Sequence, residues 1–201
     1  EESIRSWIAK SGFMDKVRLV GYIRGAVLSL LYKISDIQII PSTYEPFGIV
    51  ALEGMVNGLS VVVSDAGGLA EIVDHETTGL KIPSGNAEAL SHAILQLAGD
   101  SGLRQCLGTA GQEKARETYN WQRITQLTVK TYLEATGASL PDEKEPAVSR
   151  PPMPQPVRLA KGKTWILVVA TPELKSNRLT LDSIFAHTPL EHEIIVADNG
   201  S

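Results

Sequence analysis

The segment that decides the fold covers residues 37–53 and reads IQIIPSTYEPFGIVALE. Its first four residues are almost wholly apolar and predict a buried strand. A loop then leads into a predicted helix whose N-terminus carries Gly48, with Pro46 expected in the first turn, where proline needs no N–H partner. Because a helix N-terminus offers unpaired N–H groups and a partial positive charge, it suits a phosphate group. The segment therefore predicts a strand, a loop and an anion-binding helix start.

Two carboxylates, Glu45 and Glu53, stand eight residues apart around this helix start. Eight steps of ~100° return a helix to within a quarter turn of its starting face, so both side chains are expected at one cleft. An ionised carboxylate only accepts hydrogen bonds and suits two adjacent hydroxyl groups. The alternative interpretation is that Glu45 merely favours the helix dipole and that Glu53 lies on a solvated face.

Helices and strands alternate on both sides of this segment. Strands are expected at 17–20 and at 61–63, where three valines are apolar on both faces. The motif helix should end near Asn57. Apolar stripes predict further helices at Ile4, Trp7 and Ile8, at Val27, Leu30, Leu31 and Ile34, at Leu90, Ile94 and Leu97, at Leu103, Leu107 and Ala110, and at Trp121, Ile124 and Leu127. The last of these is expected to cross back over the protein. The order predicts an α/β fold with a doubly wound, Rossmann-like parallel sheet.

Composition excludes several classes of function. The chain has 201 residues, 43% of them hydrophobic, and a net charge of -4, which gives no basic surface for nucleic acid. Its one cysteine, Cys106, excludes an internal disulfide and suggests a cytoplasmic location. The four histidines lack metal-ligand spacing, so no metal site is expected. No apolar run approaches the ~18 residues of a transmembrane helix. Since the chain starts at Glu1 without Met, we expect a piece of a longer polypeptide.

The C-terminal part differs in composition. Residues 137–163 hold six of the 11 prolines and predict an extended linker, with a proline-rich ligand as the alternative. A strand at 165–170, a helix at 177–187 and a strand at 193–197 follow. These 38 residues are too few to bury a core, so they predict the start of a second α/β domain at 164–201. The first domain is expected to cover residues 1–136.

The motif Glu45–Glu53 resembles the E-x7-E motif of retaining GT-B glycosyltransferases of family 4, related to sucrose and glycogen synthases. The resemblance covers residues 16–135 and falls on the C-terminal nucleotide-sugar domain of that family. It includes the segments Val61–Asp65, Gly67–Val73, Thr78–Leu80 and Asn120–Trp121. The domain would be incomplete at its N-terminus, so residues 1–135 alone are expected to expose apolar sheet edges.

The resemblance assigns roles to individual residues. It implies that Glu45, the catalytic candidate, contacts hydroxyls of the transferred sugar, and that Glu53 binds the ribose. The remaining donor-binding candidates are the backbone of Phe47, Gly48, Ile49 and Val50, the glycines Gly67 and Gly68, and Ile23 beside the base. From the residues alone, Gly67 and Gly68 suit either a turn or a close approach to the donor.

The implied reaction transfers a sugar from a nucleotide-diphosphate sugar to a glycan or lipid acceptor, with retention and without a metal. The arginine and lysine that neutralise the diphosphate in this family, and its acceptor-binding domain, belong to segments outside this chain. The 201 residues alone are therefore expected to be inactive. Peripheral membrane association of a longer protein stays open.

Residues 165–171 and 193–201 resemble the opening of a GT-A glycosyltransferase of family 2. That resemblance implies that Asp198 contacts the nucleotide, and that a divalent metal binds further along such a domain. The usual residues after the first strand are replaced by Thr171-Pro172-Glu173. The main hypothesis is therefore a bifunctional glycosyltransferase that builds a polysaccharide or glycolipid. The alternatives are a nucleotide-sugar epimerase on a GT-B fold and a non-catalytic nucleotide-sugar-binding scaffold.

Overall fold

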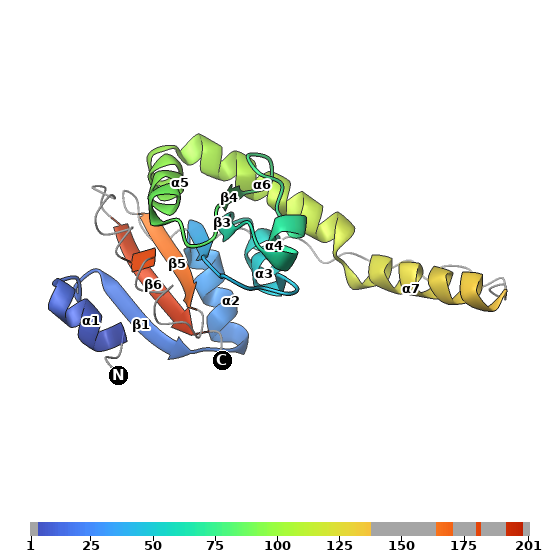
Figure 1. Cartoon of the computed structure of the whole chain (residues 1–201), viewed down its shortest axis with the longest axis horizontal. Coiled ribbons are helices and arrows are strands. Elements are labelled where there is room, and N and C mark those ends of the chain that lie inside the picture. Colours follow the sequence, from blue (N-terminus) through green and yellow to red (C-terminus); the bar gives the residue numbers. More distant parts are fainter. Residues whose placement is uncertain (1–3, 138–163, 171–179, 182–191, 199–201) are drawn as a thin grey trace.

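The structure, a computed structural model, describes residues 4–137, 164–170, 180–181 and 192–198. Within these residues six strands form one sheet in the order β1-β6-β5-β2-β3-β4 (Figure 1), and all neighbouring strands are parallel. The strands are β1 (Val17–Tyr22), β2 (Ile37–Ile40), β3 (Ser60–Ser64), β4 (Leu80–Ile82), β5 (Thr164–Ala170) and β6 (His192–Asp198). The predicted α/β fold with a parallel sheet is confirmed.

Seven helices are described from end to end, and six of them pack around this sheet. They are α1 (Ile4–Ser11), α2 (Gly25–Ile34), α3 (Ile49–Val56), α4 (Gly67–Ile72), α5 (Ala87–Gly99), α6 (Ser101–Thr118) and α7 (Trp121–Thr136). None of the described helices is long and apolar enough to cross a membrane. The predicted end of the motif helix is confirmed, because Asn57 is the C-cap of α3.

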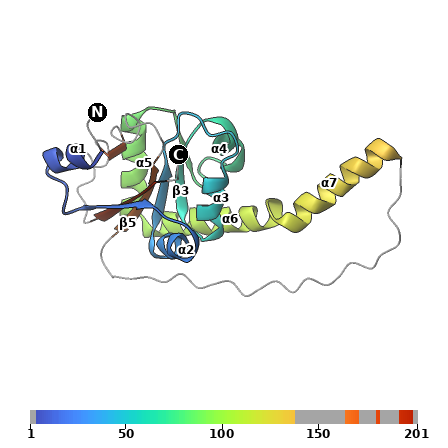
Figure 2. The ribbon, with the colours of Figure 1, turned by 90° about the horizontal axis from the view of Figure 1, so that it is seen from below.

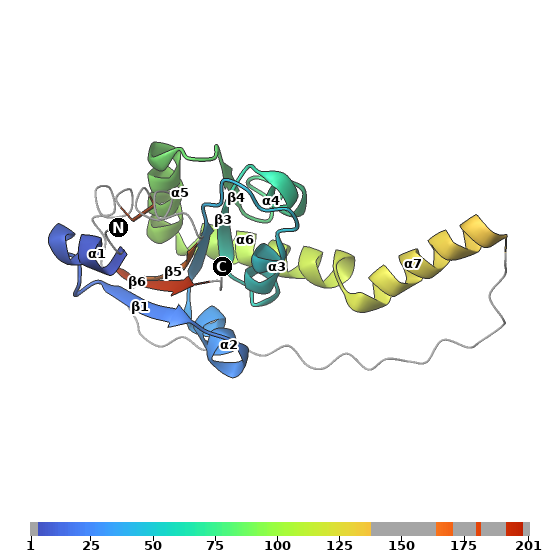
Figure 3. The same cartoon turned by 60° about the horizontal axis from the view of Figure 1, so that its bottom comes forward.

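The sheet is covered on both faces. In β2, Ile37 and Ile39 join the apolar cluster under α1 and α5, whereas Ile40 joins the cluster under α3 and α4. A third cluster on the latter side packs Tyr32 of α2 against Leu167 of β5. Figure 3 shows α5 and α2 on opposite sides of the strands. Successive strand residues point to opposite faces, so strands apolar throughout need helices on both sides.

The two C-terminal strands lie inside the sheet. β6 pairs with β1 and β5 pairs with β2, so these strands separate β1 from β2 (Figure 1). Ile166, Leu167 and Ile194 are almost fully buried there. The strands predicted for a second domain thus cover the edges that residues 1–135 would otherwise expose.

The division into domains at 1–136, 137–163 and 164–201 stays a prediction. Of the predicted linker, residues 138–163 lie outside the described residues. The predicted helix at 177–187 also lies largely outside them, although Thr180 and Leu181 are helical and buried.

Two helical predictions need correction. Val27 and Leu30 of α2 are 56% and 52% exposed, because the helix turns Leu28, Leu31 and Tyr32 to the sheet instead. Both stripes fit a helical period, but only the second brings the large Tyr32 ring into the core. Helix α7 forms as predicted but has no buried residue and projects from the body of the molecule (Figure 2). It therefore does not pack back over the protein.

Candidate functional site

The predicted site residues gather at one edge of the sheet. Because all strands are parallel, the segments that follow β1, β2 and β3 emerge at the same edge. Ile23 follows β1, the loop 41–48 follows β2, and Gly67 follows β3 at the start of α4. Asp198 is the last residue of β6 and pairs with Tyr22, so its backbone ends at this edge too. The fold thus places residues far apart in the sequence at the same edge of the sheet, although β6 and β5 lie between β1 and β2 and therefore separate Ile23 from the 41–48 loop.

Gly48 begins the motif helix in a conformation that other residues rarely adopt. It is the N-cap of α3, with φ of 71° and ψ of 21° in the left-handed region. A Cβ atom there would lie 2.8 Å from Cδ1 of Ile72 on α4. The helix therefore starts at Ile49, and Pro46 lies in the loop before the N-cap. The prediction that Pro46 occupies the first helical turn was wrong, because the left-handed glycine delays the helix start.

Glu45 is held by the loop that it belongs to and by the next one. Its half-buried carboxylate accepts a hydrogen bond from the Gly48 N–H, with 3.2 Å between Oε1 and the nitrogen. Its backbone carbonyl accepts the N–H of Gly68 at 2.8 Å. Both contacts fix the backbone around Glu45, so its side chain starts from a defined position.

Gly67 and Gly68 allow these two loops to touch. A Cβ atom on Gly67, whose φ is 50°, would overlap the carbonyl oxygen of Glu45. One on Gly68 would lie 2.5 Å from the carbonyl carbon of Phe47. Sequence reasoning considered a turn or a bound donor for these glycines, but it missed their contact with the 45–47 backbone. Nothing in the local pattern indicates that contact, since it joins loops that follow different strands.

The side chains around the helix start differ in exposure. Phe47 and Ile49 are 74% and 61% exposed, and the neighbouring Tyr44 is 79% exposed. Val50 is buried in the cluster under α3, so only its backbone is available at the edge. Ile23 is half-buried. This arrangement leaves an apolar rim beside the first amide groups of α3.

Glu53 is anchored by a different element. It lies half-buried on α3, and its Oε2 accepts a hydrogen bond of 2.8 Å from the hydroxyl of Tyr32 on α2. Burial raises the pKa of Tyr32 above its ordinary value, and the Glu53 carboxylate raises it further, whereas the nearby Gln38 amide lowers it. Sequence reasoning missed Tyr32. The available signal was a tyrosine on the sheet-facing side of a helix, since a buried hydroxyl needs a partner.

Comparison with known proteins fits this architecture. The model of the family described as glycosyl transferases group 1 matches residues 1–114, more than half of the chain. The chain belongs to the group 1 glycosyltransferases. An uncharacterized glycosyltransferase of Methanocaldococcus jannaschii is 40% identical over 121 residues, which are 60% of this chain and 31% of that protein.

Two solved structures have the same fold as the matched part of this chain. Sucrose-phosphate synthase of Thermosynechococcus elongatus is 34% identical with a TM-score of 0.62, over 68% of this chain and 34% of that one. HepE of Anabaena, solved in complex with UDP-glucose, is 26% identical with a TM-score of 0.60, over 65% of this chain and 36% of that one. This member of the family therefore spans about a third of the length of these relatives.

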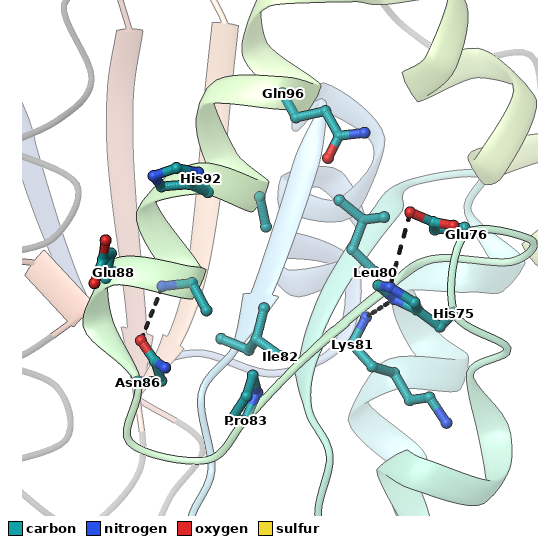
Figure 4. Close-up of a pocket in the computed structure, with 12 residues that line it drawn as sticks. His75, Glu76, Leu80, Lys81, Ile82, Pro83, Asn86, Glu88, His92 and Gln96 are labelled. Carbon is teal, nitrogen blue, oxygen red and sulfur yellow. Dashed lines mark hydrogen bonds and ion pairs between the residues drawn. The ribbon is translucent and has the colours of Figure 1, made fainter.

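The described part of this group 1 glycosyltransferase also has a hollow away from the predicted site. It has a volume of about 420 Å³ and lies between the segment around β4 and α5 (Figure 4). Its lining comprises His75, Glu76, Leu80, Lys81, Ile82, Pro83, Asn86, Glu88, Ala89, His92, Ala93 and Gln96. None of these was predicted as a site residue. No group of three or more His, Cys, Asp or Glu residues in the described ranges could hold a metal ion.

Two polar side chains of this hollow serve local structure. His75 Nδ1 accepts the backbone N–H of Lys81 at 3.0 Å, and Asn86 caps α5 by accepting the N–H of Ala89 at 2.9 Å. The hollow contains neither E-x7-E glutamate nor either glycine of the α4 start. The carboxyl edge of the sheet is therefore the stronger candidate site.

Proposed function

We propose that this chain contributes the donor-binding part of a retaining glycosyltransferase, which moves a sugar from a nucleotide-diphosphate sugar to a glycan or lipid acceptor. One observation carries the proposal. The Gly68 N–H donates a hydrogen bond to the backbone carbonyl of Glu45. This hydrogen bond joins the two loops beside the start of α3 at the carboxyl edge of a parallel sheet. Open α/β sheets bind ligands at this edge. Family membership adds glycosyl transfer to that geometry.

Each part of the donor has a proposed partner. The amide groups of Ile49 and Val50 open α3, so they and the helix dipole would receive the diphosphate. Glu45 would accept hydrogen bonds from the sugar and Glu53 from the ribose. The Anabaena structure with UDP-glucose supports this class of ligand for a protein of the same fold. The roles of Phe47, Ile23 and Asp198 stay predictions, as does the cytoplasmic location.

The transfer replaces one bond at the anomeric carbon. The acceptor oxygen would bond to that carbon while the bond from the carbon to the diphosphate oxygen breaks, and the proton of the acceptor hydroxyl would pass to an oxygen of the leaving diphosphate. The resemblance of the E-x7-E motif to retaining enzymes supports attack on the face that the nucleotide leaves. Helix amides would stabilise the departing negative charge without a metal. The identity of the acceptor stays a prediction as well.

The proposal can be tested by calorimetric titration of the 201-residue chain with UDP, ADP and GDP and with their glucose derivatives. We expect Glu53→Ala to weaken binding of the sugar-free nucleotide by roughly 10-fold or more, as for a lost hydrogen bond to a charged group. Glu45→Ala should weaken binding of the sugar nucleotide more than binding of the free nucleotide. Glu113→Ala is the matched control, because Glu113 is exposed on α6.

Three results would contradict parts of this proposal. Equal nucleotide affinity of wild type and Glu53→Ala would remove the ribose assignment. Absence of binding by the wild-type chain to every nucleotide tested would contradict donor binding itself. For a longer protein that contains this chain, a product anomer opposite to that of the donor, observed by NMR, would contradict retention. Release of an altered sugar nucleotide without an acceptor would favour the epimerase alternative.

A further inference from the structure

Tyr32 is a buried titratable residue to which the proposed reaction assigns no role. Its side chain is only 4% exposed, yet its hydroxyl group reaches across from α2 to α3. There it donates a hydrogen bond of 2.8 Å to Oε2 of Glu53. α2 and α3 cover the same side of the sheet, as Figure 3 shows. The bond thus links a rigid, buried ring to the carboxylate proposed to bind ribose.

A second buried polar side chain supports this pair from below. Gln38 on β2 is fully buried, and its Nε2 donates to the carbonyl of Val50 in α3 at 3.0 Å. Its amide also lies near Tyr32 and lowers the pKa of the tyrosine. Its Oε1 is buried without a partner in the described part of the chain, against Gly54 of α3. Burial of a polar side chain in this apolar interface costs free energy, which its hydrogen bonds offset.

Because the Tyr32 hydroxyl donates this hydrogen bond, it determines which acceptor sites of the Glu53 carboxylate remain for a ligand. Burial and Glu53 raise the pKa of Tyr32, so the hydroxyl stays a donor under ordinary conditions. One lone-pair direction of Oε2 is then occupied. Oε1 has no hydrogen-bond partner among the residues that the structure describes, so it is available to a ligand hydroxyl.

We propose that Tyr32 is a positioning residue that holds the Glu53 carboxylate ready for the two ribose hydroxyls of the donor. The inference rests on the proposed function, because it needs Glu53 to bind ribose. A free glutamate side chain loses rotamer entropy when it is fixed. When Tyr32 already fixes the carboxylate, part of this entropy is lost on folding and no longer opposes nucleotide binding. Affinity for nucleotides with a ribose should therefore depend on the Tyr32 hydroxyl.

The test compares two ligands by calorimetric titration of the 201-residue chain and of its variants Tyr32→Phe, Glu53→Gln and Tyr132→Phe. The ligands are UDP and 2′,3′-dideoxy-UDP, which lacks both ribose hydroxyls; ADP or GDP and its dideoxy form replaces them if the wild-type chain binds that base more tightly. We expect Tyr32→Phe to weaken binding of UDP by roughly 3- to 10-fold, the range of one ordinary hydrogen bond. Binding of the dideoxy nucleotide should not change. Tyr132→Phe is the matched control, because Tyr132 is exposed on α7.

A purely structural role of Tyr32 would give a different pattern. Tyr32→Phe would then weaken binding of UDP and of 2′,3′-dideoxy-UDP equally, and that result would overturn the inference. Unchanged UDP affinity in Tyr32→Phe, with weakened affinity in Glu53→Gln, would also overturn it but would leave the ribose assignment intact. Unchanged affinity in both variants would refute the ribose assignment itself. The failure of each hypothesis is therefore distinguishable.

Glu53→Asp provides a variant that leaves the Tyr32 ring in place. The shorter side chain keeps its charge but should no longer reach the Tyr32 hydroxyl. We expect UDP affinity to fall, and Tyr32→Phe to add no further loss in this background. Two fully additive losses would contradict a shared function of the pair. Glu53→Asp alone remains measurable if Tyr32→Phe folds poorly, since Glu53 is only half-buried.

Discussion

The substitution Gly68→Ala should separate the two loops of the candidate site. The Cβ atom that it adds would lie 2.5 Å from the carbonyl carbon and 2.6 Å from the carbonyl oxygen of Phe47. Ordinary contacts begin near 3.4 Å, so the backbone of one loop must move by about 1 Å. The obstructing atoms belong to the backbone and cannot rotate away. Gly68 has no positive φ, so the effect is steric and not conformational.

The expected loss of stability is about 1–3 kcal/mol, the range for overpacked sites. For a chain of this size, that corresponds to a decrease in Tm of roughly 2–12 °C. Urea unfolding followed by circular dichroism measures it directly. The displaced loop carries Glu45, so UDP-glucose affinity should fall as well, by more than UDP affinity.

Gly99→Ala is the matched control for this substitution. Gly99 is the last residue of α5, and a Cβ atom there would meet nothing within 4 Å. Replacing a helical glycine with alanine is neutral or stabilises by up to about 1 kcal/mol. If Gly68→Ala unfolded at the same urea concentration as Gly99→Ala and bound UDP-glucose equally well, the close packing of the two loops would be refuted.

Three further predictions concern the buried polar group, the C-terminal strands and pH. Gly54→Ala should destabilise the chain by about 1–3 kcal/mol, because its Cβ would overlap the Gln38 amide; in a Gln38→Val background the same change should be nearly neutral in urea unfolding. A chain ending at Gly137 should lose β5 and β6, bind more of an apolar dye and self-associate; unchanged unfolding would favour a separate domain at 164–201. Above pH 10, the unfolded chain loses the Tyr32 proton that the folded chain keeps. The free energy of unfolding should therefore fall by up to about 1.4 kcal/mol per pH unit more for wild type than for Tyr32→Phe. Parallel curves of unfolding free energy against pH would contradict the raised pKa of Tyr32.

Periodicity alone predicted much of the sheet. The strand at 61–63 is apolar throughout and the strand at 37–40 is almost wholly apolar, and this pattern correctly predicted helices on both faces. The predicted end of the motif helix near Asn57 is also correct, and Gly58 follows it with positive φ. These signals need only a few neighbouring residues, so one sequence suffices to interpret them.

Contacts between distant segments could not be predicted in this way. The face of α2 depends on Tyr32 finding Glu53, which is 21 residues further along. The packing of Gly67 and Gly68 against the 45–47 backbone depends on how two loops emerge from neighbouring strands. The insertion of β5 and β6 between β1 and β2 depends on pairing across more than a hundred residues. Local patterns carry no record of such partners.

A crystal structure of the 201-residue chain with bound UDP-glucose would test the central claim most directly. The account predicts the diphosphate against the amides that open α3, the ribose hydroxyls within hydrogen-bond distance of Glu53, and the glucose beside Glu45. A nucleotide bound in the hollow between β4 and α5, or a carboxyl edge without ligand in a crystal that holds UDP-glucose elsewhere, would contradict it.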